Sequence, residues 1–288
     1  MTIPQEIYRQ VATFLWKEDF LYTVDDTGMD NIVYVIEDEY ILRLSRNKDH
    51  NYDSEIQILT IIGAKTTIPI PQILLQDKQW QWFFYKKILW IKTDSDRTEI
   101  NNMSSDEYKW LLQDLAQFMY TMHNLISDRH IMKIGITCYD KSYNDYIFLK
   151  EHHHTITDIK LHTYVAQLLW QYQQYYTNKP IAHLWLIHND LYGNHFFIDP
   201  DSKKLSWIID FSDTTIADIQ LDFTFFYTPD TTLRSDLIDE YCTISQRTID
   251  KEFVLLNMKI FVIKHSINSW KFEDRAIERI ENWMQESI

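Results

Sequence analysis

The fold of this chain is decided by residues 184–211, which read LWLIHNDLYGNHFFIDPDSKKLSWIIDF. Two apolar runs, 196–198 and 205–209, are separated by the segment 199–204, which is rich in Asp, Lys, Pro and Ser. Short apolar runs on either side of such a segment are typical of two strands joined by a turn. The stretch therefore predicts a β-hairpin, preceded by a third apolar run at 184–187 and a polar loop.

The predicted hairpin would gather several polar side chains in one place. The outer ends of paired antiparallel strands meet, so Asp210 is expected beside Asn194 and His195. The loop that precedes the hairpin carries Asp190. Two carboxylates, an amide and an imidazole would then converge, and together with waters and phosphates such ligands suit Mg²⁺.

These residues resemble the catalytic layout of the protein-kinase-like fold. In that layout a His-x-Asp loop, a metal ligand five residues after the Asp, and an apolar run ending in Asp-Phe follow one another. The run IHNDLYGNHFFID, followed by IIDFSDTTIADIQLDF, is most similar to the aminoglycoside 2''-phosphotransferases. The likeness extends to TGMDNIVYVIEDEYILRLSR, SEIQIL and Trp270, and so spans most of the chain, with specific motifs in 188–222.

The resemblance implies an α+β, two-lobed protein-kinase-like fold with a β-rich N-lobe and a mostly helical C-lobe. Residues 1–87 would form the nucleotide-binding lobe, with a hinge near 84–88. Residues 88–288 would form the C-terminal lobe, which carries the hairpin 184–211 and a helical substrate-binding region.

The same resemblance implies roles for individual side chains. Asp190 would orient the acceptor hydroxyl and take its proton. His195 and Asp210 would hold Mg²⁺. Arg43 occupies the place of the phosphate-binding lysine, and Glu55 would be its ion-pair partner.

The remaining expected contacts concern the nucleotide and the acceptor. Thr27 and Gly28 would belong to the loop that covers the nucleotide. The hinge residues Phe84, Tyr85 and Lys86 would bind the purine through their backbone. The expected acceptor-binding residues are Asp213, Asp230, Trp270, Glu273 and Asp274, while Lys264 stands where an acid would be expected.

Periodicity and turn residues predict the other elements. A capping box, Ser104 to Glu107, should open a helix with Trp110 facing inward, and Gly63 should end a short helix. Asp218 and Asp222 are expected to be structural caps. The predicted helices cover 3–16, 54–62, 158–176 and 251–270, and the predicted strands cover 21–24, 32–36, 40–44, 72–75 and 80–86.

Composition narrows the class of protein. The chain has 288 residues, a formal net charge of −14 and only 4 Gly, which excludes the Rossmann and P-loop glycine patterns. The acidic balance argues against nucleic-acid binding, and no apolar run has the roughly 18 residues that would span a bilayer. With two distant cysteines and no signal-like N-terminus, we expect a cytoplasmic protein.

The sequence therefore predicts a Mg²⁺-dependent small-molecule kinase. It would move the γ-phosphoryl group of ATP or GTP to a hydroxyl of a small cationic molecule, with an aminoglycoside antibiotic as the leading acceptor. The alternatives are a kinase of another small alcohol and a catalytically weak, nucleotide-binding pseudokinase module. We expect a monomer with no nucleic-acid or membrane partner.

Overall fold

The computed structural model describes the chain in two compact units, and each is treated by itself below. The first unit contains residues 1–114 and 195–213, and the second contains the other described residues. The residues described are 1–26, 31–47, 52–77, 81–87, 91–92, 98–125, 136, 141–178, 184–191, 195–224, 231–269 and 280–285.

A five-stranded antiparallel sheet forms the centre of the first unit. Its strand order is β1-β2-β3-β5-β4. Tyr34 of β2, Leu42 of β3 and Phe84 of β5 lie opposite one another on one face. The strands are β1 (Tyr22–Asp25), β2 (Asn31–Ile36), β3 (Tyr40–Ser45), β4 (Ile73–Asp77) and β5 (Trp82–Lys86).

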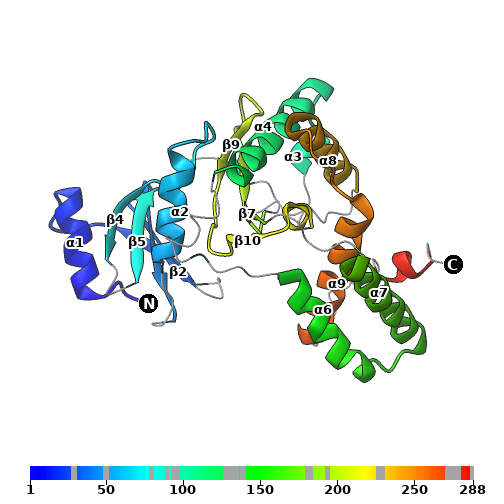
Figure 1. Cartoon of the computed structure of the whole chain (residues 1–288). Coiled ribbons are helices and arrows are strands. Elements are labelled where there is room, and N and C mark those ends of the chain that lie inside the picture. The colour runs from blue at the N-terminus through cyan, green and yellow to red at the C-terminus, as the bar shows by residue number, and fades with distance from the viewer. Residues whose placement is uncertain are drawn as a thin grey trace. The chain divides into compact units, whose positions relative to one another are not determined.

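Two helices cover opposite faces of this sheet (Figure 1). α1 (Gln5–Leu15) buries Ile7 and Val11 against the face that carries Tyr34 and Leu42. Its C-cap, Trp16, has a left-handed backbone with φ 55° and is 95 % exposed. α2 (Asp53–Gly63) covers the other face, where Arg43 of β3 points toward it.

The predicted hairpin is present and completes the first unit. β8 (Phe196–Ile198) and β9 (Leu205–Ile208) pair antiparallel, and β6 (Ile91–Lys92) pairs with β8. Asp199 accepts hydrogen bonds from two backbone N–H groups of the turn, as expected of a turn aspartate. α3 (Thr98–Asn101) and the start of α4 (Ser105–His123) also belong to this unit.

The second unit is mostly helical. α6 packs against α7 and α9, and α7 packs against α9 (Figure 1). A short two-stranded sheet, β7 with β10, lies beside the 3₁₀ helix η2. Besides the end of α4, the second unit contains α6 (Lys141–His152), η1 (His153–Thr155), α7 (Ile159–Asn178), β7 (Trp185–Ile187), β10 (Thr215–Ala217), η2 (Ile219–Phe223), α8 (Thr231–Ser245) and α9 (Lys251–Ser269).

Most sequence predictions of elements are confirmed, and one detail is wrong. The capping box is formed, since the Ser104 N–H donates to the Glu107 carboxylate at 2.7 Å. Gly63 ends α2 as expected, and the residue that caps the helix is Ala64, with an αR backbone. Trp110 does not face inward: it is 44 % exposed, with the Lys204 ammonium over its ring.

None of the described helices is both long and apolar enough to cross a membrane.

Candidate active site

The base of the hairpin brings His195 and Asp210 together, as the sequence predicts. The Ile209 N–H donates to the His195 carbonyl at 2.9 Å and closes the hairpin one residue beyond the strands. The His195 Nε2 then lies 3.6 Å from the Asp210 Oδ2. Asp210 has a left-handed backbone, φ 65°, which turns its side chain out of the strand direction.

Arg43 joins two carboxylates from different parts of the first unit. Its Nη1 donates to Glu55 Oε1 at 2.8 Å, and its Nη2 donates to Asp210 Oδ1 at 2.9 Å. The guanidinium also lies over the rings of Tyr52 and Phe83. The planar fork of arginine suits this double pairing, which a lysine ammonium would not reproduce.

Burial and charge act against each other in this network. Burial raises the pKa of Asp210. The positive charge of Arg43 and the neighbouring His195 lower it by more than burial raises it, so the pKa falls to about 2. Burial raises the pKa of Glu55 to about 7 against the opposing effect of Arg43. Burial lowers the pKa of Arg43, and the two carboxylates more than reverse this, so the guanidinium stays charged. Asp210 is therefore an anion at neutral pH.

The donor set at the hairpin base fits a divalent cation. The anionic Asp210 supplies the hard oxygen ligand that Mg²⁺ requires. The imidazole of His195 is a nitrogen donor within 3.6 Å of that carboxylate, so one ion could contact both side chains.

In the second unit, Asp222 forms hydrogen bonds with the backbone of the loop that carries Asp190. The buried Asp222 carboxylate, in η2, accepts the backbone N–H groups of His188 at 3.0 Å and Asn189 at 2.6 Å. It also contacts the His123 Nε2 at 2.9 Å. Asn189, just before Asp190, has a left-handed backbone with φ 64°. These bonds fix the backbone from which the Asp190 side chain departs.

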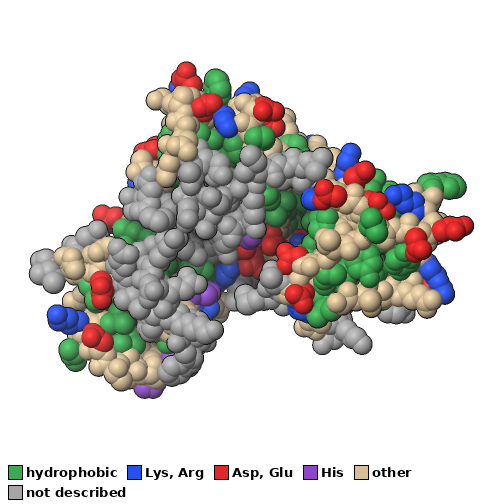
Figure 2. All heavy atoms as spheres, turned by 180° about the vertical axis from the view of Figure 1, so that it is seen from behind, with side chains coloured by type: hydrophobic (Ala, Val, Ile, Leu, Met, Phe, Trp, Pro, Cys, Tyr) green, Lys and Arg blue, Asp and Glu red, His purple; other side chains and the backbone are tan. Residues whose placement is uncertain are grey.

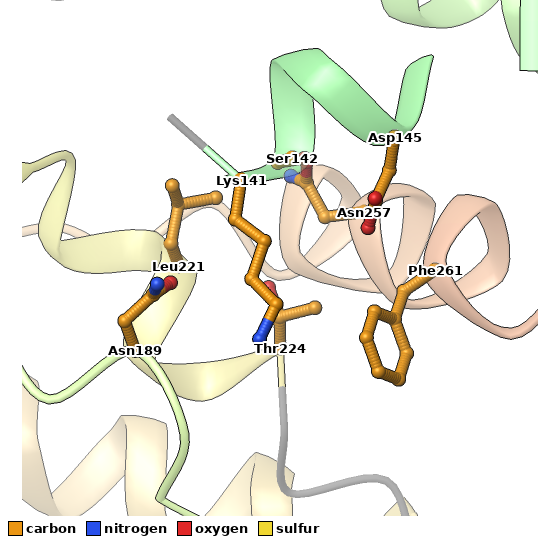
Figure 3. Close-up of a pocket in the computed structure, with 8 residues that line it drawn as sticks. All are labelled: Lys141, Ser142, Asp145, Asn189, Leu221, Thr224, Asn257 and Phe261. Carbon is orange, nitrogen blue, oxygen red and sulfur yellow. The ribbon is translucent and has the colours of Figure 1, made fainter. Parts of the chain in front are cut away.

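The Asp190 carboxylate faces a lysine of the same unit. Lys141 Nζ lies 3.9 Å from Asp190 Oδ1, and the two side chains are 21 % and 17 % exposed. Figure 3 shows the Lys141 side chain running from the start of α6 toward Thr224 and the loop that carries Asn189.

The residues expected at the hinge lie at the end of a strand. Phe84, Tyr85 and Lys86 lie inside β5, and Phe84 and Tyr85 pair with strands on both sides. Lys86, the last residue of β5, pairs with Tyr40 of β3, and the contact of this segment with a purine stays a prediction. The Phe84 ring is also fully buried and stacks on Tyr40, on the α1 side of the sheet.

Of the other expected acceptor-binding residues, the structure describes Asp213. Asp213 is exposed, directly after the hairpin in the first unit. Lys264 does not face an open acceptor site, because it forms an ion pair at 3.1 Å with the buried Asp145. The residues that lie outside the described part of the chain are Thr27, Gly28, Asp230, Trp270, Glu273 and Asp274.

The sequence does not predict a role for Lys141, and it predicts only part of the role of Asp222. Lys141 carried no motif, because its partner lies far along the chain and α6 was not predicted. Asp222 was expected only as a cap, although the motif it belongs to, I-I-D-F…L-D-F, was visible. Asp218 does cap η2, by accepting the Gln220 N–H.

The surface charge is dispersed over the described part of the face in Figure 2. There, acidic side chains are interspersed with basic and hydrophobic ones. The net charge of −14 is that of the whole chain, of which this face shows a part.

Solved structures with the same fold come from antibiotic phosphotransferases. The GDP and kanamycin complex of APH(2")-IIIa matches with a TM-score of 0.77 and 16% identity, covering 98% of each chain. The streptomycin–ATP complex of APH(2")-IIa matches with a TM-score of 0.67 and 14% identity, covering 99% of this chain and 97% of that one. The macrolide 2'-phosphotransferase of Brachybacterium faecium has a TM-score of 0.66 and 12% identity, covering 96% of each.

These likenesses confirm the predicted α+β, protein-kinase-like fold. The model of the phosphotransferase enzyme family in turn matches residues 22–252, which include the sheet, the Asp190 loop and the hairpin. The chain belongs to the phosphotransferase enzyme family.

Proposed function

We propose that the chain transfers the γ-phosphoryl group of ATP or GTP to a hydroxyl of an aminoglycoside antibiotic. The observation that carries this proposal is the Arg43–Glu55–Asp210 network with His195 at 3.6 Å from Asp210. It places a fixed cation beside an anionic metal ligand, which is the charge arrangement that phosphoryl transfer requires.

In this proposal each side chain has one task. Asp190 accepts the proton of the acceptor hydroxyl while the oxygen forms its bond to the γ-phosphorus. The bond from the γ-phosphorus to the bridging oxygen breaks, and the nucleoside diphosphate leaves. Arg43 would neutralise phosphate charge, and His195 and Asp210 would hold Mg²⁺, which supplies further positive charge to the phosphates when bound.

The aminoglycoside acceptor is supported by the family and by the kind of enzyme that shares the fold. One of these relatives was solved with kanamycin and another with gentamicin. Asp213, Asp230, Trp270, Glu273 and Asp274 remain the residues we propose for acceptor binding. Their carboxylates would pair with the acceptor's ammonium groups.

A less cationic acceptor, such as a macrolide, is the second candidate. It is favoured by Lys264 and Lys141, which pair with Asp145 and Asp190. These two acids are therefore already paired with lysines and are not available as unpaired carboxylates for an acceptor with several ammonium groups, whereas a largely neutral acceptor does not need them. Macrolide 2'-phosphotransferases share the fold at TM-scores of 0.63 and 0.66.

A coupled assay of nucleotide consumption tests the proposal. ATP and GTP are compared in the presence of Mg²⁺, with kanamycin, gentamicin, neomycin and erythromycin as acceptors, and the product is confirmed by a mass increase of one phosphoryl group. We expect acceptor-stimulated turnover that is lost in Asp190→Asn and on addition of EDTA. Stimulation by erythromycin alone would select the second candidate. No stimulation by any acceptor would contradict both and favour a nucleotide-binding module.

A further inference from the structure

We propose that Lys141 is a positioning residue for phosphoryl transfer, which holds the Asp190 carboxylate ionised and aimed at the acceptor. This inference rests on the proposed function, in which Asp190 takes the acceptor proton. It assigns a role in the reaction to the first residue of α6, far from every motif of the sequence.

The distance and burial of the pair support this role. Lys141 Nζ lies 3.9 Å from Asp190 Oδ1, with the two side chains 21 % and 17 % exposed. Exposed ion pairs contribute little, because water screens them. Because both side chains are about four-fifths buried, water screens their attraction much less. The ionised state of each side chain is then stabilised by the charge of the other.

The surroundings of Lys141 confine its ammonium group. Its side chain lines a cavity of about 10 Å³ together with Asn189, Thr224 and Phe261 (Figure 3). The Phe261 ring lies 5.9 Å from Nζ and adds a cation–π contact. A cavity of this size holds about one water molecule and no acceptor. Lys141 is therefore held in place by the protein and not reserved for a substrate in this cavity.

The charges around the cavity are matched in pairs. Asp145, the acid that lines the cavity, is buried and pairs with Lys264 at 3.1 Å. Lys141 lies 3.9 Å from Asp190, and Asp222 fixes the backbone of the residues that precede Asp190. The fixed backbone and the nearby ammonium together restrict the orientation of the carboxylate.

Removal of the ammonium should affect the chemical step more than nucleotide binding. Without Lys141, the mostly buried Asp190 carboxylate loses a nearby positive charge, which makes it easier for the carboxylate to bind a proton or to turn toward water. In either state it accepts the acceptor proton poorly. Arg43, Glu55 and Asp210, which we assign to the nucleotide and metal, lie in the other unit and keep their contacts.

The test compares Lys141→Met, Lys141→Arg and the control Lys150→Met. Methionine keeps the apolar stem against Phe261, arginine keeps the charge, and Lys150 is an exposed lysine of the same helix. We expect Lys141→Met to lower kcat by about 10² while the KM for nucleotide changes less than about twofold. Lys141→Arg should recover at least about a tenth of wild-type kcat, and Lys150→Met should match the wild type.

A double-mutant cycle tests the pairing without any activity. The free energies of unfolding of Lys141→Met, Asp190→Asn and the double variant are measured by urea denaturation. We expect the two changes to be non-additive, because each removes the same interaction. Additive effects would overturn the inference, as would a Lys141→Met variant with unchanged kcat or an arginine variant as slow as methionine. Non-additivity in a chain that phosphorylates no acceptor would instead overturn the proposed function alone.

Discussion

At the scale of the residue, Asp210 combines a strained backbone with a strongly stabilised charge. A non-glycine residue in the left-handed region costs about 1 kcal/mol. The φ of 65° is maintained because the carboxylate reaches Arg43 at 2.9 Å and Ser212 at 2.9 Å. This conformation presents the carboxylate to His195 as well, at 3.6 Å.

We predict that Asp210→Ala lowers the transfer rate by at least about 10³ and leaves a folded protein, since the side chain binds charge rather than filling a core. Steady-state assays with saturating acceptor measure the rate, and circular dichroism checks the fold. Asp201→Ala, in the exposed turn of the same hairpin, is the matched control. Near-normal turnover of Asp210→Ala would remove this residue from the site.

Single residues also show how far the sequence could predict the site. Asp190, His195 and Asp210 lie in one continuous stretch, so a local hairpin was enough to relate the last two. Arg43 and Glu55 were predicted by resemblance and do form an ion pair. Lys141 could not be predicted, because its contact with Asp190 depends on how α6 packs against the rest of its unit.

At the scale of the element, η2 fixes the loop that follows β7 through the carboxylate of Asp222. Asp222 accepts two backbone N–H groups and contacts His123, and it is fully buried. In Asp222→Asn an amide NH₂ would face backbone donors, which leaves buried groups unsatisfied.

We predict that Asp222→Asn lowers the free energy of unfolding by about 3 kcal/mol. Asp218→Ala, which removes the cap of the same short helix and a hydrogen bond from the Gln220 side chain, should cost about 1 kcal/mol. Urea denaturation of both variants measures the difference. Equal effects would mean that Asp222 is no more than a second cap.

The contact between α2 and β3 gives stability a pH dependence. Glu55 has a pKa of about 7 in the folded chain against an ordinary value of 4.5, because its charged form is buried. Between these two pH values the folded chain keeps a proton that the unfolded chain has released. The contribution of Glu55 to the free energy of unfolding therefore falls as pH rises from about 4.5 to 7.

We predict that Glu55→Gln, which cannot titrate, flattens this part of the stability profile. Urea denaturation at pH 4.5, 5.5, 6.5 and 7.5 measures the slope for the wild type and the variant. The expected result is a less negative slope in the variant over the whole interval. Parallel profiles would show that Glu55 titrates normally in the folded chain.

Elements differ in how well the sequence predicts them. α1, α2, α7 and α9 were found because their apolar residues recur at helical spacing. α6, with the sequence KSYNDYIFLKEH, and α8 were not found, because polar residues and aromatic rings blur that spacing. β10 was not found either: its three residues become a strand only by pairing with β7.

At the scale of the whole molecule, the net charge of −14 should act on a polycationic acceptor. Charges spread over a surface attract at long range, and salt screens that attraction within about 10 Å at 0.1 M and about 3 Å at 1 M. The same charge should matter little to a substrate with a single amine.

We predict that the KM for kanamycin rises several-fold between low salt and about 0.5 M NaCl, at fixed Mg²⁺ and nucleotide. The KM for erythromycin should change less than about twofold under the same conditions. Initial rates over a salt series measure both. A flat response for kanamycin would assign its binding to short-range contacts alone.

The left-handed cap of α1 has a consequence for engineering thermal stability. With 4 Gly in 288 residues, the chain ends α1 on Trp16, a bulky residue at φ 55° that is 95 % exposed. Glycine at this position would relieve about 1 kcal/mol of backbone strain and remove an indole from the solvent. Trp16→Gly should therefore raise the melting temperature by a few degrees in calorimetry. Because the chain has so few glycines, replacing a left-handed cap residue by glycine is a direct way to raise its melting temperature.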